Sequence, residues 1–292
     1  MKKILFITTR NILTTCGELR LIKNRAMSLY YDYGIGTDFL CFTKQSRIDA
    51  KHESMEFPCK IDSFPIKKSR LFYMIKEVKV ETEKRLNSLE YDVVILSGPL
   101  ITALVSVIKK KYPNIKVMVD IHGSLEDIVE VAKNAGMSRK AFFRLLYISE
   151  KYLYKRYLAK SDGLFVVTKA LKDYLDNRFK TEKVPGFIVP CATKRMHIDE
   201  EEYQRNRDKY RKKYGINSSD KLFIYSGGIS SWQCIEETLN LYETLCRTHK
   251  DYKMLLLSHQ IDLLDKSRLE NMGVITDSYS AEEVDNVLCA GD

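Results

Sequence analysis

Short apolar runs alternate with amphipathic segments along almost the whole chain. Each run is rich in β-branched and aromatic residues, and in the segment that follows, apolar residues recur every three to four positions, the period of a helix. The runs are nearly continuous in apolar residues, which is typical of strands buried on both faces. This alternation predicts an α/β fold with parallel sheets covered by helices.

The predicted elements fall into two groups. In the first group the expected strands are 4–8, 38–42, 56–66, 92–96, 116–121, 164–167 and 187–190, and the expected helices are 19–33, 69–89, 100–111, 138–160 and 169–179. A charged helix at 199–214 then leads to the polar cluster Asn217-Ser218-Ser219-Asp220, which favours a linker. In the second group the expected strands are 222–225, 254–257 and 274–275, and the expected helices are 235–248, 261–271 and 281–289.

These groups predict a first Rossmann-like domain at 1–195, a charged helix and linker at 196–219, and a second Rossmann-like domain at 220–292. The second domain would have three strands, whereas ordinary doubly wound domains have about five or six. A sheet this small leaves an unpaired edge. We therefore expect the second domain to be incomplete, either because the chain is truncated or because the neighbouring domain covers the edge.

Composition excludes several classes of protein. Apolar residues make up 45% and charged residues 30% of the chain, the balance of a globular protein rather than a disordered one. No run approaches the roughly 18 to 20 apolar residues of a membrane span, and the N-terminal run at 4–7 is too short for a signal peptide. The seven cysteines are odd in number and include no C-x-x-C pair, which favours a reducing cytoplasm over disulfides or structural zinc.

The net charge of +9 favours contact with anions. Basic and aromatic residues interleave at 139–160, and a second basic group lies at 67–79. The default interpretation is a solvated helix face. The alternative is peripheral attachment to the inner face of an anionic membrane. Nucleic-acid binding is disfavoured because no recognisable nucleic-acid-binding module accompanies the charge.

Candidate chemistry lies in the loops after strands, because open α/β sheets bind ligands beyond the carboxyl ends of their strands. The first such loop, Thr14-Thr15-Cys16-Gly17-Glu18, precedes a helix and is either a helix-entry turn or an anion site. It matches neither the dinucleotide fingerprint G-x-G-x-x-G nor the P-loop.

Two further loops stand out. In Asp120-Ile121-His122-Gly123 a histidine follows a strand, and the glycine allows close backbone approach. In Tyr225-Ser226-Gly227-Gly228 two glycines separate a strand from a helix, which either forms a plain turn or lets backbone amides approach a phosphate. No catalytic triad order and no metal-binding pattern is present, so we expect neither a metal nor a cofactor.

Five segments together resemble the GT-B-fold glycosyltransferases of family 4, bacterial enzymes that build surface glycans. They are MKKILFITTR with the Gly-containing loop after it, VMVDIHG, GLFVVTKALKDYL, FIVPCATKRMHI and KLFIYSGGISSWQCIEETL. Their order and separations match the family over nearly the whole chain. The resemblance implies two Rossmann-like domains facing each other across a cleft, with the acceptor bound by the first and a nucleotide sugar by the second.

The resemblance also implies roles for single residues. Gly17 matches the first-loop glycine near the sugar phosphates, His122 matches the active-site histidine that contacts the donor sugar, and Gly227 matches the glycine at the pyrophosphate. Gly228 and Gln233 belong to the same donor-binding loop. Thr15, Cys16 and Glu18 belong to the loop on the acceptor side.

The chain departs from the family pattern where the donor diphosphate would bind. Family members usually carry an arginine directly after the donor-domain glycine and a lysine five residues later, and here those positions are Gly228 and Gln233. Ser258-His259 stands where a glycine-rich turn is common. The family's Glu-x7-Glu segment would lie beyond Asp292, because Ala290-Gly291-Asp292 resembles the residues that precede it.

The sequence therefore predicts a glycosyltransferase that moves a sugar from a nucleotide-sugar donor to a glycan or lipid-linked acceptor with retention of configuration. Its expected location is the cytoplasm, with peripheral contact to the inner membrane face. Two alternatives stay open: a non-catalytic glycosyltransferase-like binding subunit, which the missing arginine and lysine favour, and a GT-B-type nucleotide-sugar epimerase.

Overall fold

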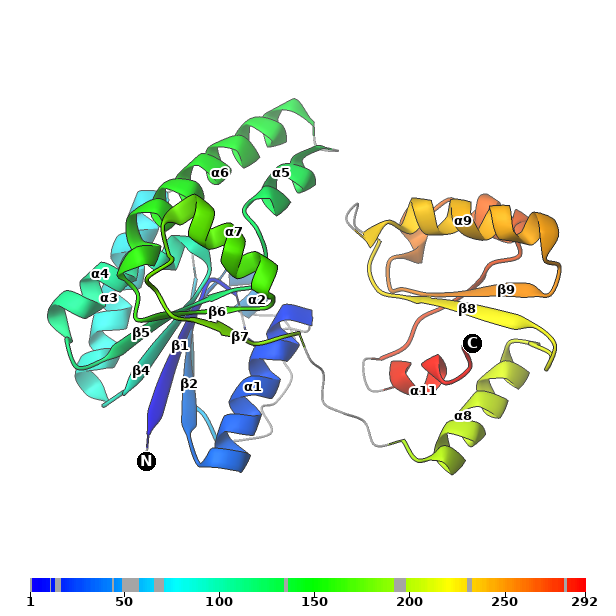
Figure 1. The fold of residues 1–292 in the computed structure, drawn as a ribbon, viewed down its shortest axis with the longest axis horizontal. Coiled ribbons are helices and arrows are strands. Elements are labelled where there is room, and N and C mark those ends of the chain that lie inside the picture. Colours follow the sequence, from blue (N-terminus) through cyan, green and yellow to red (C-terminus); the bar gives the residue numbers. More distant parts are fainter. Residues whose placement is uncertain are drawn as a thin grey trace. The chain divides into compact units, whose positions relative to one another are not determined.

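The computed structural model describes residues 2–10, 12–13, 17–43, 45–48, 58–65, 71–133, 136–191, 198–229, 233–280 and 283–292. The chain divides into two compact units, Met1–Lys194 and Arg195–Asp292 (Figure 1). Each unit contains its own parallel sheet, as the alternation of apolar runs predicts.

The first unit is built on a seven-stranded parallel sheet in the order β3-β2-β1-β4-β5-β6-β7. Its strands are β1 (Lys3–Thr8), β2 (Gly36–Thr43), β3 (Ile61–Pro65), β4 (Val93–Ser97), β5 (Lys116–Ile121), β6 (Gly163–Val166) and β7 (Gly186–Ile188). Its helices are α1 (Gly17–Tyr33), α2 (Gln45–Ile48), α3 (Leu71–Ser88), α4 (Leu104–Lys111), α5 (Glu126–Lys133), α6 (Met137–Tyr157) and α7 (Lys169–Phe179), with 3₁₀ turns at Pro99–Ala103 and Leu158–Lys160.

Alternate residues of the central strands are buried on opposite faces of this sheet. On β1, Leu5 and Ile7 join one hydrophobic cluster, while Ile4 and Phe6 join the other with residues of α1. Both clusters are sealed from solvent, which explains why the strands are nearly continuous apolar runs. The strand order reverses between β1 and β4, and such a reversal opens a crevice at the carboxyl ends of the strands.

Several predicted elements differ from the observed ones. The helix expected at 100–111 begins as a 3₁₀ turn at Pro99–Ala103, and the helix expected at 138–160 ends in one at Leu158–Lys160. The sequence analysis missed α5, a short helix that directly follows the His122 loop. The strand expected at 56–66 is confined to Ile61–Pro65 within the described residues.

The second unit has three parallel strands in the order β10-β9-β8. They are β8 (Lys221–Ser226), β9 (Tyr252–Leu257) and β10 (Ile275–Asp277). The helices are α8 (Glu200–Lys213), α9 (Ile235–Thr248), α10 (Lys266–Asn271) and α11 (Val284–Leu288), with a 3₁₀ turn at Ile261–Leu263. The Asn217–Asp220 cluster, expected to be a linker, lies inside this unit as a hydrogen-bonded turn between α8 and β8.

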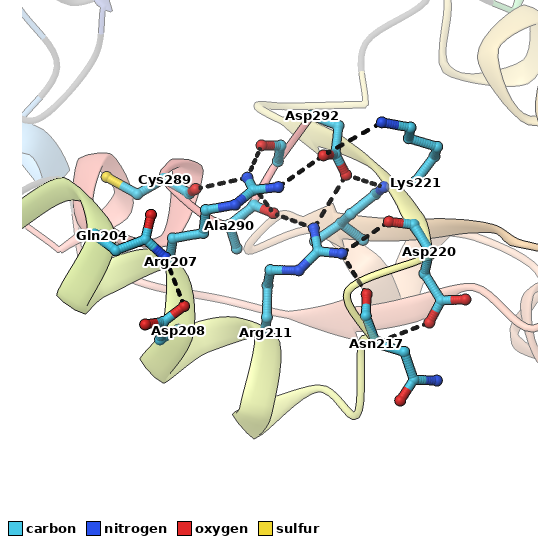
Figure 2. Close-up of polar contacts among 12 residues, drawn as sticks. Gln204, Arg207, Asp208, Arg211, Asn217, Asp220, Lys221, Cys289, Ala290 and Asp292 are labelled. Carbon is cyan, nitrogen blue, oxygen red and sulfur yellow. Dashed lines mark hydrogen bonds and ion pairs between the residues drawn. The ribbon is translucent and has the colours of Figure 1, made fainter.

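Helix α8 is charged along its length and yet belongs to the packed second unit. Asp199 caps its first turn, three glutamates follow the cap, and basic residues fill its last turn, an arrangement that suits the helix dipole. Two arginines of the helix attach it to the C-terminal residues of the chain (Figure 2). Arg207 binds Asp292 at 2.7 Å, and Arg211 binds the same carboxylate at 3.0 Å.

Arg211 is buried, and both terminal nitrogens of its guanidinium donate hydrogen bonds. It donates to the carbonyls of Ala290 at 3.2 Å and Asp220 at 2.7 Å, and to the carboxylate of Asp292. Burial alone raises the pKa of Asp292, but hydrogen bonds from the Leu222 amide and the two arginines lower it to about 2. Arg211 thus joins α8, the turn before β8 and the C-terminal residues through one side chain.

We expect Arg211→Met to destabilise the second unit by about 1–3 kcal/mol, because it leaves the buried carbonyls of Ala290 and Asp220 without this donor, while Asp292 keeps Arg207. Native-state hydrogen exchange of the β8 and β9 amides measures this loss. Arg205→Met on the same helix is the matched control. Arg205 is exposed and lies 3.9 Å from Glu201, so its loss should cost less than about 0.5 kcal/mol. Equal effects of the two substitutions would contradict this account of Arg211.

Candidate functional site

The carboxyl edge of the first sheet brings together the ends of three strands. Strand pairing aligns Thr8 of β1 with Ser97 of β4, and Ser97 with Asp120 of β5. The loops that leave these strands line a cavity of about 450 Å³. The lining residues are 8–10, 97–99, 120–125, 127 and 128, with Glu150 and Tyr154 contributed by α6.

Two glycines shape the cavity wall. Gly98 has a φ of 116°, a conformation that L side chains rarely adopt, and a Cβ there would lie 3.1 Å from Thr9 Oγ1. At Gly123 a Cβ would collide with the carboxylate of Asp127. The glycine after His122 therefore permits the close backbone approach that the sequence predicts, although the group that approaches is a side chain of α5.

Asp120, His122 and Arg25 form a connected polar cluster at the end of β5. The Asp120 carboxylate is buried and lies 2.8 Å from His122 Nε2 and 3.1 Å from Arg25 Nη1. Arg25, from α1, also donates to the carbonyl of Val189 at 2.9 Å. The Asp120 carboxylate beside Nε2 fixes the imidazole ring, and Nδ1 has no partner among the described residues. His122 is thus held as an oriented hydrogen-bonding group in the cavity wall.

Glu150, on α6, also lines this cavity. It is 8% exposed, and no hydrogen bond or ion pair joins it to the described residues. Burial raises the pKa of this carboxyl to about 7. The side chain is therefore a desolvated acid without a partner in the part of the chain that the structure describes.

The first-loop candidates fall largely outside the described residues. Thr15 and Cys16 lie outside them altogether. Gly17 is the first residue of α1 and Glu18 the second, so the helix begins two residues earlier than expected. The roles of these four residues stay predictions.

In the second unit the donor-loop candidates lie together after β8. Gly227 has a φ of 156°, and its amide donates to the carbonyl of Leu257 at 3.1 Å. A Cβ at Gly228 would lie 2.6 Å from Gln233 Oε1, and Gln260 accepts from the amide of Ile229 at 3.1 Å. The structure therefore brings Gly227, Gly228 and Gln233 together.

This loop lacks basic side chains in the part that the structure describes. Residues 226–229 and 233–237 contain no lysine or arginine, and the first turn of α9 carries Glu236 and Glu237. Backbone amides are therefore the available groups for an anion, and the two carboxylates oppose one.

Sequence reasoning missed three residues of the first-unit site. Asp120 appeared only as part of the His122 motif, although the two-residue spacing on a strand places both side chains on one face. Glu150 had a recognisable signal, because it is the one acidic residue in the basic segment 137–157. Arg25 had none, because it is 95 residues away from Asp120 along the chain.

No protein-family model and no curated protein matches this sequence. Solved structures do match. The lipopolysaccharide outer core galactosyltransferase WaaB in its apo form is 12% identical with a TM-score of 0.64, over 99% of this chain and 72% of that one. Sucrose-phosphate synthase from Thermosynechococcus elongatus is 12% identical with a TM-score of 0.66, over 100% and 74%.

Two further structures extend this set. Anabaena HepE in complex with UDP-glucose is 12% identical with a TM-score of 0.60, over 100% of this chain and 72% of that one. A UDP-N-acetylglucosamine 2-epimerase is 12% identical with a TM-score of 0.52, over 98% and 71%. At these identities the likeness concerns the fold, and the α/β, GT-B-like architecture expected from the sequence is confirmed.

Proposed function

We propose that this chain is a glycosyltransferase that moves a sugar from a nucleotide-sugar donor to a hydroxyl of a glycan or lipid-linked acceptor, with retention of configuration. The observation that carries the proposal is the oriented His122–Asp120 pair in a cavity at the carboxyl edge of the first sheet. It occurs on a fold shared with proteins named as a galactosyltransferase and a sucrose-phosphate synthase. Retention rests on the family resemblance of the sequence.

Each unit has a separate task in this proposal. In the first, the cavity takes the acceptor, and Nδ1 of His122 orients the transferred sugar through a hydrogen bond with one of its hydroxyls. In the second, the loop at Gly227 and Gly228 receives the donor's diphosphate through the Gly228 amide, because the Gly227 amide already donates to the carbonyl of Leu257. The complex of HepE with UDP-glucose supports a nucleotide sugar as the donor.

Stabilisation of the departing diphosphate is the weak step. A cation about 4 Å from a phosphate contributes up to about 4 kcal/mol at an effective dielectric of about 20, and the described loop supplies none. Loop amides provide the remaining electrostatic stabilisation. We therefore expect the chain to bind acceptor better than donor and to turn over slowly.

The double substitution Gly228→Arg and Gln233→Lys tests this reasoning. It places cations at the two positions where the family usually carries them, and replacing Gln233 removes the side chain that would crowd a Cβ at residue 228. We expect the affinity for UDP, measured by calorimetry, to rise at least tenfold, with a steep dependence on salt.

The matched control is Gly136→Arg with Gln204→Lys, which adds the same charge outside the proposed donor loop. A Cβ at Gly136 would meet no atom within 4 Å. A similar gain in UDP affinity in the control would show that the added net charge, rather than the position of the cations, causes the effect. Tight UDP binding by the unaltered chain would contradict the proposed deficit.

The two alternatives differ from transfer in their products. The missing cations favour a non-catalytic binding subunit, and the epimerase among the similar structures favours epimerisation. We expect UDP release from a UDP-sugar to require an added acceptor and to fall at least a hundredfold in His122→Ala, because the sugar loses its oriented partner. Chromatography of the nucleotide products measures both.

His249→Ala is the matched control, since His249 is an exposed histidine at the C-terminal end of α9. Conversion of the UDP-sugar into an isomer without acceptor would favour the epimerase. No UDP release, even from the double variant with added cations, would favour the binding subunit.

Helix α6 offers a surface for peripheral membrane contact, which we propose as part of this function. Phe142, Leu145, Ile148 and Tyr152 are each more than half exposed. Helical spacing places the last three on one face. The exposed charges of the helix are all basic: Arg139, Lys140, Arg144, Lys151, Lys155 and Arg156. No helix within the described residues is long and apolar enough to cross a membrane. An apolar stripe flanked by cations fits the surface of an anionic bilayer.

We expect the protein to sediment with phosphatidylglycerol vesicles and not with phosphatidylcholine vesicles. Leu145→Ser with Ile148→Ser should weaken this binding at least tenfold, because the apolar stripe no longer inserts. Leu241→Ser with Leu263→Ser removes exposed leucines from the second unit and is the control. An equal loss of vesicle binding in both double variants would contradict the proposed surface. Equal binding to phosphatidylglycerol and phosphatidylcholine vesicles would also contradict it.

A further inference from the structure

The cavity of the first unit contains one acidic group whose presence the fold does not explain. Asp120 pairs with Arg25 and His122, and Asp127 accepts from Ser124 Oγ at 3.0 Å. Glu150 lines the same cavity, and no described group pairs with it. A buried carboxyl without a partner is costly to the fold, so a group outside the described chain is the natural partner.

We propose that Glu150 recognises a neutral sugar ring of the acceptor in this cavity, through hydrogen bonds between its carboxyl and the ring hydroxyls. The inference rests on the proposed function and deepens it, since it names both the recognising side chain and the chemical class of its ligand. Glu150 is nine-tenths buried and borders the cavity, so the groups that could reach it are those that enter there.

The position of Glu150 on its helix explains why it stays unpaired. Residues three and four positions away share its helix face, and they are Leu146, Tyr147, Leu153 and Tyr154. None of them is a cation, although six lysines and arginines lie exposed elsewhere on α6. The exposed cations of the helix therefore lie on other faces, and the acid points to the cavity.

The cavity lining favours an uncharged, hydroxyl-rich ligand. Asp120 is neutralised by Arg25, which leaves the carboxyls of Asp127 and Glu150 and one guanidinium, that of Arg10, as the remaining charged groups of the described lining residues. This surplus of acids disfavours a phosphate and suits hydroxyl donors. The volume of about 450 Å³ lies in the range of about 300–1,000 Å³ typical of small-ligand sites.

Both protonation states of Glu150 can serve such a ligand. Burial raises the pKa of the carboxyl to about 7, so the charged and neutral forms coexist near neutral pH. The carboxylate accepts from two hydroxyls, and the neutral acid donates to one and accepts from another. A ring with adjacent hydroxyls satisfies either form.

Glu150→Leu separates recognition from a structural role, because the two predict opposite changes in stability. If Glu150 serves a ligand, an apolar side chain of similar size relieves a buried unpaired acid, and Tm rises by about 2–4 °C. If Glu150 supports the fold, Tm falls. The probes for binding are the methyl glycosides of glucose, galactose, mannose and N-acetylglucosamine. Saturation-transfer NMR detects their binding to the full chain in the absence of nucleotide.

We expect at least one methyl glycoside to bind the unaltered chain, and its affinity to fall at least tenfold in Glu150→Leu while Tm rises. Glu77→Leu, at an exposed position of α3, should leave affinity unchanged. Unchanged glycoside binding in Glu150→Leu, a lowered Tm, or no binding by the unaltered chain would each overturn the proposal. UDP binding is measured in parallel, so loss of donor binding with glycoside binding intact would count against the proposed function and leave this site standing.

Discussion

A buried carboxylate at the end of β5 organises the candidate site of the first unit. Asp120 is 3% exposed and accepts from Arg25 and His122, which belong to different parts of the chain. Because Arg25 also donates to the carbonyl of Val189, one guanidinium ties α1 to β5 and to the residue after β7. Desolvating Asp120 is tolerable only while both partners remain. The fold and the orientation of His122 therefore depend on the same charge.

The basic residues of this protein fall into two kinds. Some hold the fold together through hydrogen bonds, and others are exposed to solvent. In the second unit Arg207 and Arg211 are committed to the C-terminal residues and the turn before β8. In the first unit six exposed cations lie on α6, and further exposed cations lie on α3 and α4. The described loop after β8, where a diphosphate would bind, has none. A net charge of +9 therefore predicts attraction to anions without predicting where on the molecule it acts.

The sequence predicts strands and helices better than it predicts partners. The bounds of β5, α7 and α9 match their apolar patterns, because each is a regular element flanked by turn residues or a capping residue. Helix α5 was missed because eight residues with four charges give a weak signal after a glycine loop. His122 could be found from its place after a strand, whereas Arg25 reaches Asp120 only through the crossover of α1 over the sheet. Such a contact requires the tertiary fold.

Two buried charged residues of the first unit differ in whether the described fold supplies a partner for their charge. Arg85 is buried on α3, and its guanidinium is 2.6 Å from Asp62 and 2.8 Å from the Tyr91 hydroxyl, so its charge is compensated within the fold. Glu150 is similarly buried and has no such compensation among the described residues. A sequence under selection for stability alone would replace such an acid by a leucine at little structural cost. Its presence in the cavity that His122 and Asp120 also line is understandable if the missing partner arrives with the substrate.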